Sequence, residues 1–150
     1  MTAPPTLACA DLITFQDGKP HLQGGQCADC LETYFPAATS CTRCRSTNMR
    51  GLDLGARGVL WSWTIQQFLP KAPYAGNETA DTFQPYGVGY VQMACGLKVE
   101  ARLTEADPAA LSIGMPMTLV LAPYRTDAGD GPTHTFAFEP TIHTKGAHHA

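Results

Sequence analysis

Four cysteines, arranged as two Cys-x-x-Cys pairs, are the residues of this chain whose type and spacing most clearly predict chemistry. The first pair is Cys27 and Cys30, the second is Cys41 and Cys44, and ten residues separate the two pairs. A Cys-x-x-Cys turn directs both sulfurs toward one point, and a hairpin that joins two such turns supplies the four thiolates that zinc prefers. Because protein ligands fill all four positions, the predicted metal is structural rather than catalytic.

Three other uses of these cysteines compete with structural zinc. Two disulfides require an oxidising compartment, and the N-terminal residues have neither the basic region nor the apolar segment of a secretory signal. A redox-active dithiol needs one pair and so accounts for half of the pattern. Iron, as in rubredoxin, takes the same four ligands, and spacing does not distinguish it from zinc. The two other cysteines, Cys9 and Cys95, have no evident base nearby in sequence, and we expect them to be buried thiols.

The composition describes a globular chain without bulk attraction for phosphate. The 150 residues are 44% hydrophobic and 15% charged, and the formal net charge is −3 before the metal site is counted. Twelve prolines and fourteen glycines favour short strands joined by loops over long helices. The longest apolar runs are too short to cross a membrane. We therefore expect a cytoplasmic protein that binds neither membranes nor nucleic acid.

Period-two alternation predicts five strands after the cysteines. The expected strands are 58–65, 86–93, 97–103, 117–121 and 135–138, with one helical turn within 105–113. In the third strand, Leu97, Val99, Ala101 and Leu103 alternate with charged residues and should face the core. Five short strands and one small helix favour an OB-fold barrel, and another small β-barrel or sandwich with the same number of strands remains as the alternative.

The expected organisation is mostly β, with a rubredoxin-like zinc ribbon before a five-stranded OB-fold barrel. We divide the chain into an N-terminal extension at 1–21, the zinc ribbon at 22–48, the OB-fold domain at 49–140 and a C-terminal tail at 141–150. Residues 49–57 are expected to be the joint between ribbon and barrel. The ribbon is too small to bury a core, so metal binding must supply much of its folding free energy, on the order of 10–16 kcal/mol for structural zinc.

Several motifs fall in one order along the chain. They are Leu22 to Cys30 (LQGGQCADC), Phe35-Pro36, Cys41 to Cys44 (CTRC), Gly58 to Thr64 (GVLWSWT), Pro85 to Val91 (PYGVGYV), Gly96 to Val99 (GLKV) and Ile113 to Met115 (IGM). In this order the chain resembles the acyl-CoA-associated family that joins a rubredoxin-like zinc ribbon to an OB-fold, over about residues 12–140. The cysteines are the specific part of the resemblance, and the other motifs carry weight through their order.

The resemblance implies a role as an accessory subunit. Members of that family are partners of thiolase-like enzymes, which make or break C–C bonds in acyl-CoA substrates. A chain of this kind would bind a thiolase-like catalytic subunit and form a wall near its coenzyme A channel, and the catalytic cysteine would belong to the partner. The cofactors implied are one structural zinc and, as substrate of the complex, a coenzyme A thioester.

Two positions depart from the family pattern. The family often has glycine directly after each Cys-x-x-Cys, whereas this chain has Leu31 and Arg45, so both turns must close without it. The family also often has an acidic residue before the glycine that corresponds to Gly96, and here that residue is Cys95. If the acidic residue has a role in other members, this chain lacks it.

The connection at 67–85 is the most informative feature outside the cysteines. Loops of this length in a small barrel are usually functional or disordered. Phe68, Tyr74 and Phe83 lie in it among three prolines, and Tyr86 follows directly. Aromatic side chains on a proline-stiffened loop suit a partner surface or the wall of a coenzyme A channel. The alternative is a loop that folds back over the open end of the barrel.

Other residues have simpler interpretations. Trp61 and Trp63 share one face of the first barrel strand if alternation is regular, and we place them in the core rather than on a base-stacking surface. Lys71, Arg102 and Arg125 could meet a coenzyme A phosphate, but on an acidic chain we expect isolated surface charges.

The preferred function is therefore a non-catalytic accessory subunit of a thiolase-like enzyme. No nucleophile with an adjacent base is visible in the sequence, so the chain alone should catalyse nothing. A nucleic-acid-binding zinc-ribbon and OB-fold module is the main alternative, since both folds serve that purpose elsewhere. The acidic charge and the absence of a basic stripe weigh against it.

Overall fold

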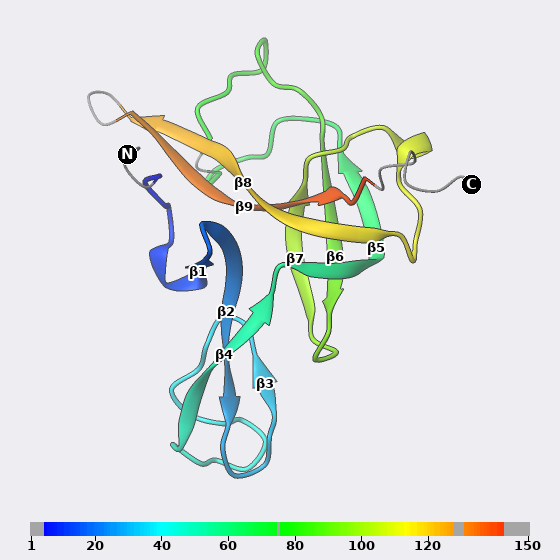
Figure 1. Ribbon diagram of the computed structural model, residues 1–150. Coiled ribbons are helices and arrows are strands. Elements are labelled where there is room, and N and C mark those ends of the chain that lie inside the picture. Colours follow the sequence, from blue (N-terminus) through cyan, green and yellow to red (C-terminus); the bar gives the residue numbers. More distant parts are fainter. Residues whose placement is uncertain (1–4, 75, 128–130, 143–150) are drawn as a thin grey trace.

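The computed structural model describes residues 5–74, 76–127 and 131–142, and this part of the chain is almost entirely β-structure. Two sheets are present: a four-stranded sheet that carries the cysteines and a closed five-stranded barrel (Figure 1). The helical elements of the described part are two single 3₁₀ turns, η1 (Ala10–Leu12) and η2 (Pro108–Ala110). Neither turn is long enough to cross a membrane. The expected mostly-β architecture, a zinc ribbon followed by an OB-fold barrel, is confirmed.

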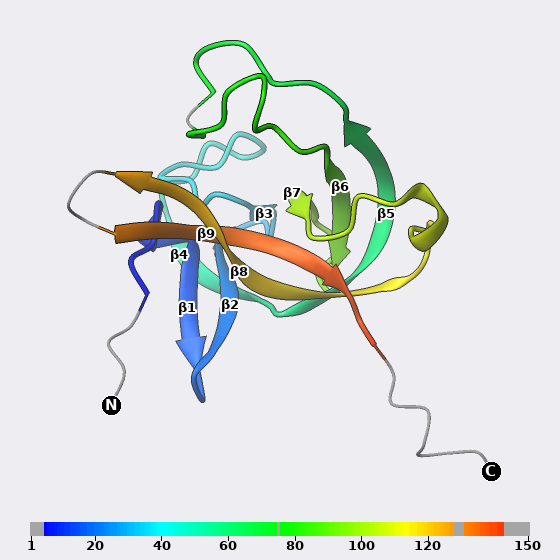
Figure 2. The ribbon, with the colours of Figure 1, turned by 90° about the horizontal axis from the view of Figure 1, so that it is seen from above.

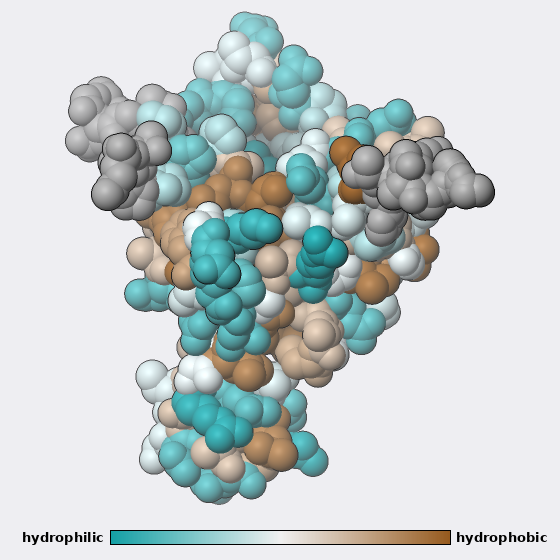
Figure 3. Space-filling model, in the orientation of Figure 1, coloured by the Kyte–Doolittle hydropathy of each residue, from teal (hydrophilic) through white to brown (hydrophobic). Residues whose placement is uncertain are grey.

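Strand β2 (Lys19–Cys27) organises the ribbon sheet. It pairs antiparallel with β1 (Ile13–Gln16), with the short β3 (Thr33–Tyr34) and with β4 (Met49–Gly55). Residues 49–55, expected to be a joint at the start of the OB-fold domain, are therefore a strand of the ribbon sheet. Their sequence contains two glycines and alternates only over residues 52–54, so the pairing with β2 rather than the local pattern makes them a strand. Figure 3 shows this end of the molecule as a smaller lobe below the barrel.

The barrel closes in a Greek-key order that matches the OB-fold. Its strands are β5 (Arg57–Gln66), β6 (Tyr86–Met93), β7 (Lys98–Leu103), β8 (Pro116–Asp127) and β9 (Gly131–Pro140). Around the barrel they follow the order β5-β6-β7-β9-β8, with β8 returning to β5 (Figure 2). The strands β8 and β9 run beyond their predicted ends and form a long hairpin at the side of the barrel.

One continuous core joins the ribbon sheet to the barrel. Leu22 of β2 and Leu54 of β4 are buried in the same cluster as Leu60, Met117 and Phe138 of the barrel strands. The backbone N–H of Leu119 also donates to the carbonyl of Ala56 at 2.7 Å, across the point where the two sheets meet. The parts of β2 and β4 around Leu22 and Leu54 therefore contribute to the stability of the barrel.

The two tryptophans do not share a face, contrary to expectation. A β-bulge lies between Leu60 and Ser62 where β5 pairs with β6, and it shifts the alternation by one residue. Before the bulge, Leu60 is fully buried and Trp61 is 49% exposed; after it, Trp63 packs against the core. Regular alternation cannot predict this because the bulge depends on the facing strand.

Gly89 of β6 shows why the barrel needs glycines opposite this bulge. A Cβ atom at Gly89 would lie 2.7 Å from the carbonyl oxygen of Ser62 and 3.0 Å from the Leu60 side chain. The strands β5 and β6 can approach this closely only without a side chain there.

Two smaller expectations need correction or lie outside the described residues. Cys9 and Cys95, expected to be buried, are both exposed. The C-terminal tail predicted at 141–150 falls outside the described residues from 143 onward, and so does the side chain of Arg125.

Candidate metal centre and aromatic loop

The four cysteines of the two Cys-x-x-Cys pairs converge at the far end of the ribbon sheet. The Sγ atoms of Cys27, Cys30, Cys41 and Cys44 all lie within 4.8 Å of one another. Two pairs of these atoms, Cys27 with Cys44 and Cys30 with Cys41, are 3.5 Å apart. A tetrahedral ion with Zn–S bonds of about 2.3 Å needs sulfurs about 3.8 Å apart, so the donor set fits zinc. The four thiols would hold the ion, which would supply cross-linking rather than reactivity.

The two cysteine turns repeat the same hydrogen bonds. In the first, the N–H of Leu31 donates to the Cys27 carbonyl at 2.9 Å, and the N–H of Cys30 faces the Cys27 Sγ at 3.5 Å. In the second, the N–H of Arg45 donates to the Cys41 carbonyl at 2.9 Å, and the N–H of Cys44 faces the Cys41 Sγ at 3.4 Å. The N–H groups of Cys30 and Cys44 stabilise negative charge on the Cys27 and Cys41 sulfurs.

The turns close with non-glycine residues in the left-handed region. Leu31 has φ of 69° and Arg45 has φ of 65°, a conformation that costs little only for glycine. These are the two positions at which the family resemblance led us to note the absence of glycine. The turns therefore keep their geometry and bear the conformational strain.

Tyr34, between the two cysteine pairs, lies against the cysteines. The N–H of Thr42 donates to the Tyr34 oxygen at 3.0 Å, which leaves the hydroxyl proton free for the Cys41 Sγ at 3.2 Å. This hydrogen bond, together with the backbone N–H groups of Cys44 and Arg43, lowers the pKa of Cys41 to about 6. Phe35, the next residue, turns the other way and packs edge-on against Phe136 of the barrel, with ring centroids 5.6 Å apart.

Three of the four aromatic residues singled out for the partner or coenzyme A contact meet around Arg102. The Arg102 guanidinium stacks on the Tyr86 ring at 3.8 Å and donates from Nη2 to the Tyr74 oxygen at 3.2 Å. Phe83 packs edge-on against Tyr86, with ring centroids 5.9 Å apart. Phe68 is not part of the group and is 73% exposed.

Arg102 was expected to be an isolated surface charge, and the structure corrects this. The Arg102 side chain is partly buried. The Tyr74 hydroxyl, which accepts from Arg102, in turn donates to the Glu78 carboxylate at 3.1 Å. Arg102 of β7 pairs with Val88 of β6, so it lies diagonally across from Tyr86, two residues before Val88 on the same face of the sheet. This cross-strand relation is the feature from which the contact with Tyr86 could have been predicted. A hollow of about 560 Å³ opens beside the Arg102 side chain. Lys71, considered with it, is exposed.

Comparison with known proteins places both halves of the chain. Residues 18–50 match the model of the ChsH2 rubredoxin-like zinc ribbon domain, and residues 53–122 match that of the ChsH2 C-terminal OB-fold domain. A protein of Pyrococcus furiosus described as a DUF35 domain-containing scaffold protein is 30% identical over 125 residues, which are 83% of this chain and 86% of the relative.

A solved structure has the same fold. The chain is similar to one from an Ltp2-ChsH2(DUF35) aldolase, with a TM-score of 0.59 and 22% identity. The match covers 81% of this chain and 86% of the other.

Proposed function

This chain belongs to the DUF35 family, in which a ChsH2-type zinc ribbon precedes an OB-fold, and from this premise we propose that it is a non-catalytic accessory subunit of a thiolase-like enzyme. The complex would act on acyl-CoA, cleaving or forming a C–C bond. The observation that carries the proposal is the match over most of the chain to a relative described as a scaffold protein. The aldolase named in the solved structure of the same fold supports the same role.

The proposed role separates structure from catalysis. In the metal centre the four cysteines would supply all the ligands of a zinc ion, which would leave no position for a substrate. The chain would contribute by burying apolar surface of its partner and by shaping the channel through which the thioester reaches the partner's catalytic cysteine. Positioning of this kind raises the rate without contact to the bond that changes. We place this complex in the cytoplasm.

The aromatic loop at 67–85 is the part that we assign to the channel. Arg102 anchors it from the barrel through Tyr74 and Tyr86, so the loop presents a defined surface. Phe68, exposed on the same loop, is available for contact with the partner. The adjoining hollow is lined by the aromatic rings of Tyr86, Tyr124 and Phe136, by the Arg102 cation and by the Glu100 carboxylate. The rings suit the apolar part of a coenzyme A thioester, and Arg102 is the group that would meet its anionic part.

Co-expression with a thiolase-like catalytic subunit from the same organism tests the proposal. The expected result is a soluble complex that co-elutes and turns over acyl-CoA, whereas each subunit alone is inactive or much weaker. Replacing Phe68, Tyr74 and Phe83 together by alanine should weaken association or raise the apparent KM for the thioester without changing the zinc content. A partner that is fully active alone and never co-elutes with this chain would refute the accessory role.

A further inference from the structure

Three large apolar side chains gather on the outside of the barrel, where β5, β6 and β7 lie side by side. Val59 is 45% exposed, Trp61 is 49% exposed and Tyr90 is 41% exposed. Arg57, Lys98 and Glu100 project from the same side of these strands, since they alternate with buried residues in each strand. These six residues form what we call the outer β5–β7 face. Neither the metal centre nor the loop accounts for its apolar surface.

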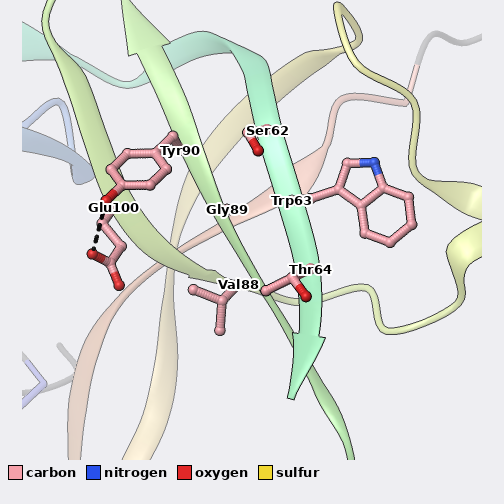
Figure 4. A pocket seen from close by; sticks show the side chains of 7 residues that line it. All are labelled: Ser62, Trp63, Thr64, Val88, Gly89, Tyr90 and Glu100. Atoms are coloured by element: carbon pink, nitrogen blue, oxygen red, sulfur yellow. Dashed lines mark hydrogen bonds between the residues drawn. The ribbon is translucent and has the colours of Figure 1, made fainter. Parts of the chain in front are cut away.

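The exposed rings of this face are held in place. Trp61 and Tyr90 pack edge-on, with centroids 6.2 Å apart and planes at 88°. The Lys98 ammonium lies 4.4 Å above the Trp61 ring. The Tyr90 hydroxyl donates to the Glu100 carboxylate at 3.4 Å (Figure 4). Rings that are already ordered lose little side-chain entropy when a partner covers them. Tryptophan and tyrosine are also the residues that most often dominate the binding energy of an interface.

Two hollows flank the exposed rings. One, of about 170 Å³, lies beside Tyr90 between the side chains of Thr64 and Val88. A cavity of about 150 Å³ accepts benzene, so this hollow has room for one aromatic or branched side chain. The other, of about 420 Å³, lies beside Val59 and is bounded by Arg57. The outer β5–β7 face therefore has exposed rings flanked by two hollows, and apolar side chains of a partner could pack into these hollows.

The charge of the face is opposite to that of the whole chain. Arg57 and Lys98 provide two cations against the single carboxylate of Glu100, although the chain carries a net charge of −3. Among the described residues, neither cation has a carboxylate oxygen within 4.0 Å. A complementary surface would therefore present apolar side chains bordered by carboxylates.

The arrangement favours a protein over single-stranded nucleic acid. Base stacking needs an open aromatic face, and a cation already lies over each of two rings here, Lys98 over Trp61 and Arg102 over Tyr86. The edge-on pair of Trp61 and Tyr90 likewise presents no parallel platform.

We propose that the outer β5–β7 face docks the catalytic partner subunit, through a region of that subunit in which apolar side chains are bordered by carboxylates. The inference rests on the proposed accessory function and names the surface that serves it. It makes Trp61 and Tyr90 the central contacts and Lys98 the residue that selects for acidic neighbours.

The test measures the affinity of purified variants for the thiolase-like subunit. The double variant Trp61→Ala/Tyr90→Ala should weaken binding at least tenfold, and Lys98→Glu should weaken it in a way that high salt reduces. Phe15→Ala is the matched control, because it removes a ring of similar exposure, 43%, from β1 of the ribbon sheet. It should bind as the unmodified chain does. Zinc content and circular dichroism establish that each variant is folded.

The outcomes separate this inference from the proposed function. If the unmodified chain binds no thiolase-like subunit, the accessory function itself fails. If the unmodified chain binds and Trp61→Ala/Tyr90→Ala binds equally well, the accessory function stands and the outer β5–β7 face is not the docking surface. The unmodified chain and Trp61→Ala/Tyr90→Ala are also compared for binding to labelled single-stranded DNA and for self-association in sedimentation. If the double variant loses either property and still binds the thiolase-like subunit, the face serves nucleic acid or a second copy of the chain, and the proposal is wrong.

Discussion

At the scale of single residues, the metal centre shows what the two cysteine turns require and what this chain supplies. Leu31 and Arg45 each adopt a positive φ directly after a Cys-x-x-Cys. A left-handed backbone places Cβ close to the following carbonyl and costs a non-glycine residue about 1–2 kcal/mol. Both side chains are exposed, so neither contributes much packing in return.

We expect Leu31→Gly and Arg45→Gly to stabilise the ribbon. Each should raise its stability by on the order of 0.5–1 kcal/mol, since relief of strain exceeds the extra entropy that glycine loses on folding. The measurement is zinc affinity by competition with a chelator, together with the temperature at which the metal is released.

Leu31→Ala is the matched control for this prediction. It shortens the same side chain and keeps the Cβ atom that causes the strain, so it should give no gain. An equal gain from alanine and glycine would mean that backbone strain is not the reason.

At the scale of elements, Arg102 connects β7 to the long loop and to the start of β6. Its guanidinium contacts one ring by stacking and another by a hydrogen bond, and lysine cannot reproduce both contacts. The loop residues that we assign to the channel are therefore held by a residue outside the loop.

Arg102→Leu should loosen the loop at 67–85. The stacking and the hydrogen bond together contribute about 2 kcal/mol. Amide hydrogen exchange in the loop should therefore accelerate more than tenfold, whereas exchange in β6 and β8 should change little. Hydrogen exchange followed by mass spectrometry measures this directly.

Lys98→Ala provides the comparison for the loop experiment. It removes a second cation of β7 that lies over an aromatic ring, but the ring under Lys98 is that of Trp61, which is not part of the loop. Its loop should exchange at the normal rate. Unchanged exchange in Arg102→Leu would show that the loop is held by other contacts.

At the scale of the whole molecule, the ribbon and the barrel are joined by a shared core. Leu22 and Leu54 of the ribbon sheet close one side of the cluster that fills the barrel. Damage at the metal centre, at the far end of β2 and β4, should therefore reach the barrel through these strands.

Cys41→Ser should abolish zinc binding and unfold the lower part of the ribbon. The barrel strands should persist in circular dichroism but melt at a lower temperature. If Leu22 and Leu54 lose their burial, the barrel is destabilised by on the order of 3 kcal/mol. Elemental analysis and thermal melts check the two parts of the prediction.

Cys95→Ser is the control for the metal prediction. Cys95 is exposed on the turn between β6 and β7 and does not belong to the four-sulfur site. Its zinc content and melting temperature should be those of the unmodified chain. A red, iron-containing protein, or a folded protein without metal, would contradict the zinc assignment itself.

The sequence by itself determined the features that depend on local spacing. Two Cys-x-x-Cys pairs predict a four-sulfur site because each turn brings its own sulfurs together, and the structure places all four within 4.8 Å. Regular alternation at Leu97, Val99, Ala101 and Leu103 predicted the inward side of β7, since nothing interrupts the pleat there. The number of short strands favoured an OB-fold barrel and left another small β-barrel or sandwich as the alternative, and the pairing of distant strands decided between them.

Only the tertiary structure decided the features that depend on a partner strand. The bulge after Leu60 arises from the pairing of β5 with β6, and it moves Trp61 from the expected core to the outer β5–β7 face. Residues 49–55 become a strand because β2 provides the facing edge. Arg102 becomes an anchor because barrel closure and the course of the loop bring Tyr74 and Tyr86 to it. Contacts between segments distant in sequence leave no local pattern, so spacing and alternation could not predict them.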